Sequence, residues 1–82
     1  MPYYVYVLQS LKDSKYYIGS TSDITARLDY HNSGTQRSTK SRIPFVLVYS
    51  EEWPTKQEAL IREKQIKSYK GGRAFKKLLE PA

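Results

Sequence analysis

The segment Tyr3–Gln9, with the sequence YYVYVLQ, constrains the fold more than any other part of this 82-residue chain. Its aromatic and β-branched residues favour a strand, and their near-continuous apolarity indicates that both faces of the strand are covered. The chain has no cysteine, so neither disulfides nor a thiolate zinc site can replace a hydrophobic core. We therefore expect one compact domain over residues 1–82.

Two further segments have the composition of strands. Tyr16–Thr21 (YYIGST) predicts a second strand, joined to the first by a hairpin loop at Leu11–Lys15. Phe45–Tyr49 (FVLVY) predicts a third strand, which begins after Pro44, where a missing N–H does least harm.

Helix signals lie between and after these strands. Ser22 or Thr21 is expected to cap a helix that starts at Asp23 and ends near Gly34. Thr55 and Glu58 form a capping-box pattern for a second helix.

The second helix is expected to run to about Lys67 or Tyr69, before Gly71-Gly72. Phe75, Leu78 and Leu79 predict a short final helix, and Thr35–Arg42 a polar, basic loop. The order ββαβαα indicates an α+β fold with a small, largely antiparallel sheet.

The longest apolar or aromatic run, Tyr3–Leu8, is far shorter than the roughly 20 residues that a membrane span needs. Polar Gln9 follows at once and no small-residue cleavage site appears, so we expect no signal peptide and a cytoplasmic protein.

The charge of the chain is concentrated toward its C-terminus. Fourteen Lys and Arg against eight Asp and Glu give a net charge of +6, and the segment from Trp53 onward carries +5 of it, with eight basic and three acidic residues. Concentrated positive charge favours polyanions, and nucleic acid first, through counterion release. A solvated helix with lysine-rich faces is the alternative interpretation.

Polar residues occupy helix positions that should be apolar. On the first helix the stripe that starts at Ile24 continues through Arg27, Leu28 and His31. On the second, Glu63 lies between Ala59 and Ile66, and Arg62 is its neighbour. An inward carboxylate is usually paired or bound to a metal ion, because burying it alone costs several kcal/mol. An ion pair between Arg27 and Glu63 at the edge of the core is the plain structural alternative.

Tyr6 and Tyr17 fall on the two strands of the hairpin. If the connecting loop holds two or four residues, the numbers of opposed residues have an odd sum and both side chains lie on the same face. A three-residue loop would put them on opposite faces.

Together these residues resemble the GIY-YIG nuclease superfamily. Tyr4-Val5-Tyr6 precedes Tyr17-Ile18-Gly19 by about ten residues, like the two tripeptides of the family name, although Tyr4 departs from the first. The resemblance continues through Arg27, His31-Asn32, Gly34, Leu47-Val48-Tyr49, Glu58-Ala59-Leu60, Glu63 and Ile66-Lys67, and so spans nearly the whole chain. The chain looks most similar to small stand-alone bacterial members, which are kin to the catalytic domain of the excision-repair nuclease subunit and to homing endonucleases.

The resemblance implies a three-stranded antiparallel sheet flanked by helices and a one-metal phosphodiesterase site that hydrolyses DNA. Glu63 would hold the divalent ion, Mg²⁺ or Mn²⁺, and Arg27 would bind the scissile phosphate. Tyr6 and Tyr17 would organise or deprotonate the attacking water; either could be the base, and we favour Tyr6. His31 would support the base or the phosphate. DNA repair is an expectation from kinship.

The chemistry of these residues is consistent with that assignment. A carboxylate is a hard oxygen ligand suited to Mg²⁺, and a guanidinium can bind phosphate at two points. A tyrosine, with an ordinary pKa of about 10, needs help to act as a base. The residues expected to contact substrate are Gly19, where a side chain would intrude, Arg37, Lys40 and Arg42 in the loop, and Lys67. We expect no small-molecule cofactor and no membrane partner, and the oligomeric state stays open, a monomer included.

Two other classes of function remain. A nucleic-acid-binding module without catalysis would stack bases on the aromatic strands and bind phosphates with the basic loop and helix. It leaves Glu63 unexplained, because a carboxylate repels phosphate. A protein-interaction domain with solvated charges leaves the inward Arg27, His31 and Glu63 unexplained.

Overall fold

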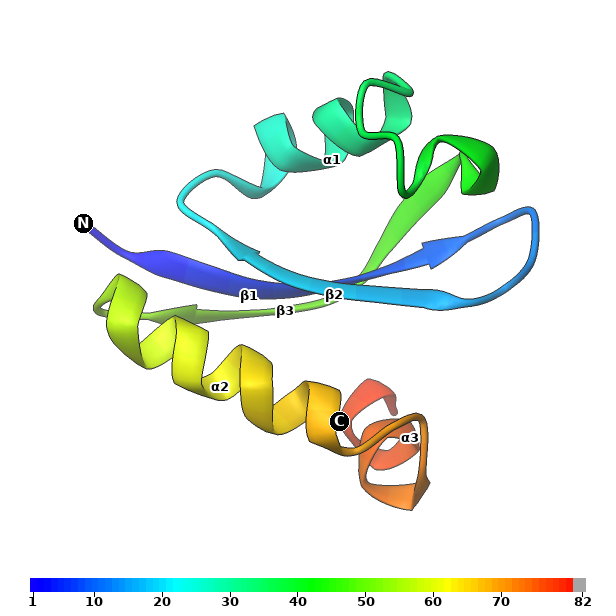
Figure 1. The fold of residues 1–82 in the computed structure, drawn as a ribbon. Helices are drawn as coiled ribbons and strands as arrows, with labels where there is room; N and C mark the ends of the chain where they lie inside the picture. The colour runs from blue at the N-terminus through cyan, green and yellow to red at the C-terminus, as the bar shows by residue number, and fades with distance from the viewer. Residues whose placement is uncertain (81–82) are drawn as a thin grey trace.

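The computed structural model describes residues 1–80, which form the predicted order ββαβαα (Figure 1). The strands are β1 (Tyr3–Ser10), β2 (Tyr16–Thr21) and β3 (Phe45–Trp53), and the helices are α1 (Ile24–Asn32), α2 (Lys56–Ser68) and α3 (Arg73–Leu79), with a single 3₁₀ turn, η1, at Lys40–Arg42. The predicted α+β class is thereby confirmed. No helix within residues 1–80 is long and apolar enough to span a bilayer.

β1 is the middle strand of an antiparallel sheet with the order β2-β1-β3. One helix layer, α1, lies over one face of this sheet, and α2 and α3 lie under the other (Figure 1). Both faces of β1 are therefore covered, as its apolar sequence predicts.

The two faces of β1 belong to two separate cores. Val5 and Val7 pack toward the α2 and α3 layer, against Ala59, Ile66 and Phe75. Tyr6 and Leu8 point the other way, together with Phe45 of β3 and with Leu28 of α1 and Tyr17 of β2 at the margin. The alternation along β1 thus places Tyr6 in the middle of the sheet, on the α1 face. No other residue predicted for the site lies on this central strand.

The hairpin register settles where the tyrosines point. The backbone N–H of Ser10 donates to the carbonyl of Lys15, which leaves a four-residue connection. Tyr6 lies opposite Gly19, and Leu8 opposite Tyr17. These odd sums put Tyr6 and Tyr17 on the same face, as the even loop length requires.

β3 is longer than the apolar segment Phe45–Tyr49, which predicted a strand that ends at Tyr49. Ser50 to Trp53 continue the pairing with β1 despite two glutamates, after a bulge opposite Val7 and Leu8. Glu51 is tolerated because it accepts hydrogen bonds from Trp53 (2.9 Å) and Arg62 (2.6 Å). One partner from the strand itself and one from α2 therefore satisfy the carboxylate in this extension of the strand.

The N-terminal cap of α1 differs from the prediction. The cap is Asp23, whose carboxylate accepts from the N–H of Ala26 (3.0 Å), and neither Ser22 nor Thr21 takes that place. Thr21 lies one step earlier and accepts from the N–H of Asp23 (3.1 Å). A charged acceptor at the positive end of the helix dipole is the stronger cap. For α2 the expected cap, Thr55, is confirmed and accepts from Glu58 N–H (3.2 Å).

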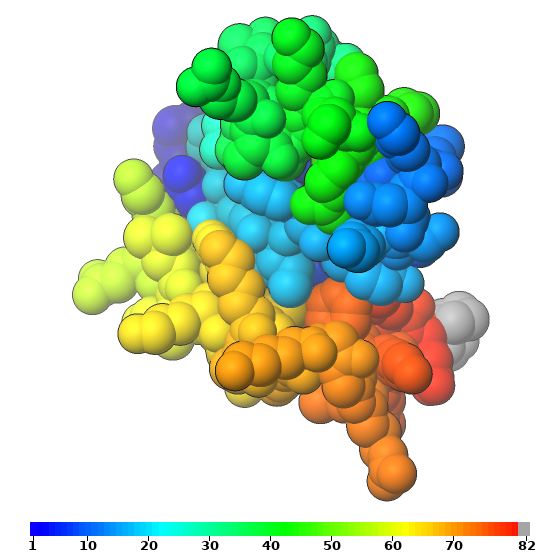
Figure 2. Space-filling view, turned by 45° about the vertical axis from the view of Figure 1, so that its right-hand side comes forward, coloured from blue at the N-terminus to red at the C-terminus, as the bar shows by residue number. Residues whose placement is uncertain are grey.

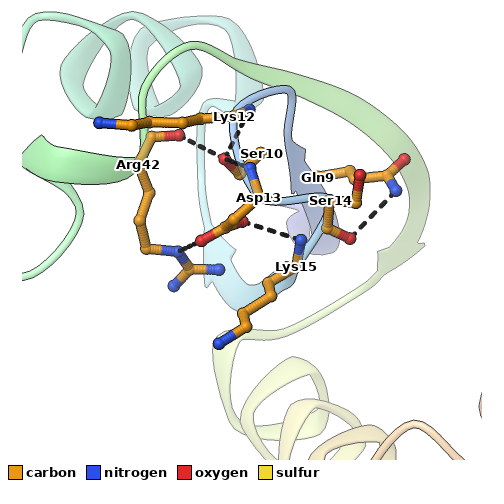
Figure 3. Close-up of polar contacts among 7 residues, drawn as sticks. All are labelled: Gln9, Ser10, Lys12, Asp13, Ser14, Lys15 and Arg42. Atoms are coloured by element: carbon orange, nitrogen blue, oxygen red, sulfur yellow. Dashed lines mark hydrogen bonds and ion pairs between the residues drawn. The ribbon is translucent and has the colours of Figure 1, made fainter.

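The basic loop Thr35–Arg42 is fastened to the tip of the β1–β2 hairpin (Figure 3). The fully buried Ser10 hydroxyl donates to the carbonyl of Arg42 (2.5 Å), and the carboxylate of Asp13 pairs with the Arg42 guanidinium (3.2 Å). The Leu11 N–H also donates to the carbonyl of Pro44 (2.9 Å). These contacts give a polar segment a fixed place beside α1.

The cap assignment predicts the outcome of two substitutions. Asp23→Ala should lower the free energy of unfolding by about 1 kcal/mol, because the Ala26 N–H loses its acceptor. Ser22→Ala, one residue away and exposed, should change it by less than about 0.5 kcal/mol. Urea denaturation of the two variants checks this, and equal losses would contradict the assignment.

Candidate active site

The phenol of Tyr6 is the centre of a polar cluster inside the α1-side core. Tyr6 is almost completely buried, and its ring crosses the neighbouring strand above Gly19. A Cβ at position 19 would lie 2.4 Å from the Tyr6 hydroxyl oxygen and 2.7 Å from the ring carbon that bears it. Gly19 therefore makes room for Tyr6, and the space above this glycine is filled by that ring.

Two side chains of α1 reach the Tyr6 hydroxyl. Arg27 donates through Nε (3.3 Å), and Nε2 of His31 lies 3.3 Å from the same oxygen. The two residues are one turn apart on α1, so they face the sheet together. The two inward polar residues seen in the sequence, Arg27 and His31, thus share the buried Tyr6 hydroxyl as a hydrogen-bonding partner.

Burial sets the protonation of this cluster. Burial raises the pKa of Tyr6 above its ordinary value, against the opposing effect of Arg27. The hydrogen bond with Tyr6 raises the pKa of Arg27. Burial, and then the charge of Arg27, lowers the pKa of His31. Near neutral pH the cluster therefore holds a protonated phenol, a guanidinium cation and a neutral imidazole.

Tyr17 flanks the cluster from β2. Its ring meets His31 edge to face, with the ring centroids 4.7 Å apart. Tyr17 is half-buried, whereas His31 is fully buried. On the outer side Arg27 lies over the exposed ring of Tyr30, 5.2 Å from its centroid.

Glu63 comes from α2, the helix layer on the opposite side of the sheet. Its Oε1 accepts from the hydroxyl of Ser20 (2.6 Å), and its Oε2 pairs with Lys67 (2.6 Å). Ser20 follows Gly19 on β2, which is an edge strand. The Tyr6 hydroxyl approaches Gly19 from the α1 face of the sheet, and Glu63 reaches Ser20 from α2, which lies on the opposite face. After burial and Tyr17, the charge of Glu63 is among the causes that raise the pKa of Tyr6.

The ion pairs of α2 bear on the structural alternative for Glu63. Arg62 pairs with Glu51 (2.6 Å), and Arg27 bonds to Tyr6. Neither arginine is thus the ion-pair partner of Glu63 within residues 1–80. That partner is Lys67, whose side chain is 53% exposed, so the pair is a weak one.

The structure joins four of the five predicted site residues directly. Arg27 and His31 contact Tyr6, and Tyr17 contacts His31. Glu63 is bound to Ser20 of β2, next to Gly19. Solvent reaches this group through the half-buried members, because Tyr6 and His31 are enclosed. In Figure 2 the hairpin segment that holds β2 lies between the α1 and loop layer above and the α2 and α3 layer below. Two cavities, of about 340 and 150 Å³, lie elsewhere, beside Phe75 and beside Trp53.

The predicted substrate contacts differ in their surroundings. Arg37 and Lys40 are exposed and form no ion pair within residues 1–80. Arg42 pairs with Asp13, and its guanidinium lies 5.7 Å from the centroid of Phe45. Lys67 pairs with Glu63. The charges of Arg42 and Lys67 are thus already partly matched by neighbouring carboxylates.

Two residues of the cluster gave no clear signal in the sequence. Ser20 holds Glu63 and directly follows the second tripeptide, a place that could have drawn attention to it. Thr39 is almost fully buried, with its hydroxyl 3.3 Å from Nδ1 of His31. Thr39 lies in a polar loop without hydrophobic periodicity, so the sequence does not indicate its burial or its contact with His31.

Comparison with known proteins identifies the family. The family model described as the GIY-YIG catalytic domain matches residues 2–76. The chain belongs to the GIY-YIG family. Among its relatives, UPF0213 protein SH2523 of Staphylococcus haemolyticus is 39% identical over 79 residues, which cover 95% of each chain. A UPF0213 protein of Staphylococcus aureus is 43% identical over 68 residues, 82% of each chain.

The structure of a similar protein has been solved. The solution NMR structure of the UPF0213 protein BH0048 from Bacillus halodurans is 36% identical, with 92% of each chain covered and a TM-score of 0.49. GIY-YIG is a nuclease family, and the match over residues 2–76 includes all five predicted catalytic residues of this chain.

The close contact over Gly19 predicts a specific coupling in this GIY-YIG protein. Gly19→Ala should cost about 1–3 kcal/mol of stability, because the enclosed Tyr6 ring cannot move aside. Tyr6→Leu removes the three atoms that the new methyl would meet, so in that background Gly19→Ala should cost much less. Thermal melts of the four proteins give this double-mutant cycle. Equal costs in both backgrounds would contradict the packing argument.

Proposed function

We propose that this GIY-YIG protein is a divalent-metal-dependent DNA endonuclease that hydrolyses phosphodiester bonds at a one-metal site. The observation that carries the proposal is the Tyr6 hydroxyl, bound by Arg27 and His31, with the Glu63 carboxylate at the adjoining strand edge. Phosphodiester hydrolysis needs a base for water, a cation for the phosphoryl oxygens and a hard ligand for a metal ion. Processing or repair of DNA is the proposed setting, on the family match.

Arg27 has the donors that a scissile phosphate requires. Its Nε bonds to Tyr6, which leaves the two terminal nitrogens to bind phosphate oxygens. Arg27 is half-buried, so part of its guanidinium faces solvent. Charge that develops on the phosphoryl oxygens would meet a cation already held in place.

Tyr6 and His31 would share the proton of the attacking water. A free phenolate is disfavoured here, because burial raises the pKa of Tyr6. The water O–H bond breaks and its proton goes to the Tyr6 oxygen, while the proton of Tyr6 goes to Nε2 of His31. The resulting hydroxide attacks phosphorus, the bond between phosphorus and the leaving oxygen breaks, and that oxygen takes a proton from solvent. His31 then returns its extra proton to solvent through Tyr6. The neutral imidazole supplies the acceptor that this transfer needs.

The residues present fit a single hard divalent ion, Mg²⁺ or Mn²⁺. Mg²⁺ keeps most of its waters and takes one or two protein carboxylates. Glu63 would hold the ion, since its Ser20 bond fixes the carboxylate and its Lys67 partner is largely exposed and can move away. When bound, the ion would polarise a phosphoryl oxygen and stabilise negative charge.

The rival function, nucleic-acid binding without catalysis, needs open aromatic surfaces. Tyr6 is enclosed, and one side of Tyr17 is covered by His31. Tyr6 and Tyr17 are therefore poor platforms for stacking bases. This observation favours the nuclease over the binding module.

Replacing Glu63 by glutamine, its amide, tests whether the carboxylate binds the metal ion. Glu63→Gln should lower Mg²⁺-dependent nicking of a mixed DNA panel by at least about 100-fold, because the metal ligand loses its charge. DNA binding should be kept or strengthened. The unfolding free energy should change by less than about 1 kcal/mol, since the amide oxygen can still accept from Ser20 and the Lys67 pair is exposed.

Glu58→Gln is the matched control, because Glu58 is exposed on the same helix. It removes the same charge from the protein and should leave nicking unchanged. A large fall in melting temperature of Glu63→Gln with unchanged nicking would make Glu63 a structural residue and would contradict the proposal.

DNA binding should depend steeply on salt. The logarithm of the binding constant should fall with the logarithm of salt concentration, by about 0.9 for each phosphate neutralised. The double variant Arg37→Gln, Lys40→Gln should have a shallower slope by up to about 1.8 if both exposed side chains contact phosphates. Fluorescence anisotropy from low to physiological salt measures the slope. An identical slope would place DNA away from this loop.

A further inference from the structure

A threonine outside the motifs named in the sequence analysis contacts the buried imidazole. Thr39, in the loop after α1, is 1% exposed, and its hydroxyl lies 3.3 Å from Nδ1 of His31. The same hydroxyl donates to the carbonyl of Gln36 (3.4 Å). Tyr6, His31, Thr39 and Gln36 thus form a continuous chain of hydrogen-bonding groups.

The single hydroxyl proton of Thr39 sets the direction of this chain. A threonine hydroxyl has one proton, and this one goes to the Gln36 carbonyl, which has no proton to give. Toward His31 the hydroxyl can then only accept, so Nδ1 carries the imidazole proton. A neutral imidazole has one N–H, which leaves Nε2 bare and facing the Tyr6 hydroxyl.

The opposite tautomer leaves donors and acceptors mismatched. With the proton on Nε2, the Tyr6 oxygen would receive hydrogen bonds from both Nε2 and Arg27, and its own proton would lose the imidazole as its acceptor. The Thr39 proton would have to turn to Nδ1 and leave the Gln36 carbonyl, which would keep the Thr39 backbone N–H (3.2 Å) as its donor. Each lost partner for a buried polar group costs free energy.

We propose that Thr39 is a positioning residue that fixes His31 as the Nδ1-protonated tautomer, so that Nε2 accepts the proton of Tyr6. The tautomer is inferred from the partners that these side chains can satisfy together, and it requires no catalytic step. Its effect on cleavage rests on the proposed function, in which Tyr6 passes its proton to His31.

The fold holds Thr39 in place from the opposite side. The N–H of Arg42 donates to the Thr39 carbonyl (3.0 Å), which begins the η1 turn. Arg42 is itself held by Ser10 and Asp13 at the hairpin tip (Figure 3). The loop is therefore a support for the imidazole, as well as a basic surface.

The tautomer can be measured directly, because His31 is the only histidine of the chain. A long-range ¹H–¹⁵N spectrum of the ¹⁵N-labelled protein distinguishes the protonated from the bare ring nitrogen. We expect the wild type to be protonated at Nδ1. Thr39→Val keeps the shape of the side chain and removes the hydroxyl, and should move the imidazole toward the Nε2-protonated form. Thr39→Ser should restore the wild-type spectrum.

Cleavage should follow the tautomer. Thr39→Val should lower kcat by about 10- to 100-fold with little change in KM, and Thr39→Ser should recover most of the rate. Thr35→Val, an exposed threonine of the same loop, is the matched control and should change neither spectrum nor rate.

The outcomes separate the two proposals. A wild type protonated at Nε2 overturns the assignment, even if Thr39→Val does not fold. A folded Thr39→Val that keeps the Nδ1 proton also overturns it. A wild type protonated at Nδ1 that cleaves no DNA with Mg²⁺ or Mn²⁺ supports the tautomer and contradicts the proposed nuclease.

Discussion

The burial of a phenol hydroxyl in the middle of the sheet governs the rest of this structure. β1 lies between two helix layers, so any polar group on it must find its partners inside the protein. The hydroxyl of Tyr6 finds Arg27 and His31 on α1 and needs a glycine beneath its ring on β2. Once the imidazole is enclosed as well, its second nitrogen requires a partner, and Thr39 supplies one. A chain of obligatory hydrogen bonds thus connects the central strand to a surface loop.

The edge strand β2 brings the two helix layers within reach of each other. A central strand would separate Tyr6 from α2, because side chains on opposite faces of a sheet do not meet. β2 has no strand neighbour on its outer side, and at Gly19 it has no side chain on the α1 face. The carboxylate of Glu63, held by Ser20, can therefore lie at the same strand edge as the phenol and add to the charges that raise the pKa of Tyr6, although it belongs to the other layer. The combination of an acid from one layer with a cation from the other depends on this edge.

Local rules predicted most of the fold. The apolar run of β1 indicated a strand covered on both faces, and the inward position of Arg27 and His31 pointed to a polar cluster. The shared face of Tyr6 and Tyr17 stayed open in the sequence, because it depends on a loop length that the structure supplied. Features that depend on distant partners escaped prediction. At the polar end of β3, Glu51 depends in part on Arg62 of α2 as a partner, and Thr39 carries no periodic signal. The cap of α1 was placed one or two residues too early, since Thr21, Ser22 and Asp23 are all good caps and only the backbone decides among them.

The neighbouring charges on α2 show why an inward acid need not be structural. Arg62 turns toward β3 and Glu63 toward β2, so the two do not neutralise each other. Burial alone would raise the pKa of Glu51, but hydrogen bonds from Arg62, Tyr49 and Trp53 hold it below its ordinary value. Glu51 thus has every sign of an acid that stabilises the fold. Glu63 has one hydroxyl and one exposed lysine as partners, and a carboxylate with so few partners retains lone pairs for an ion. The contrast between these two glutamates separates the structural acid from the candidate metal ligand.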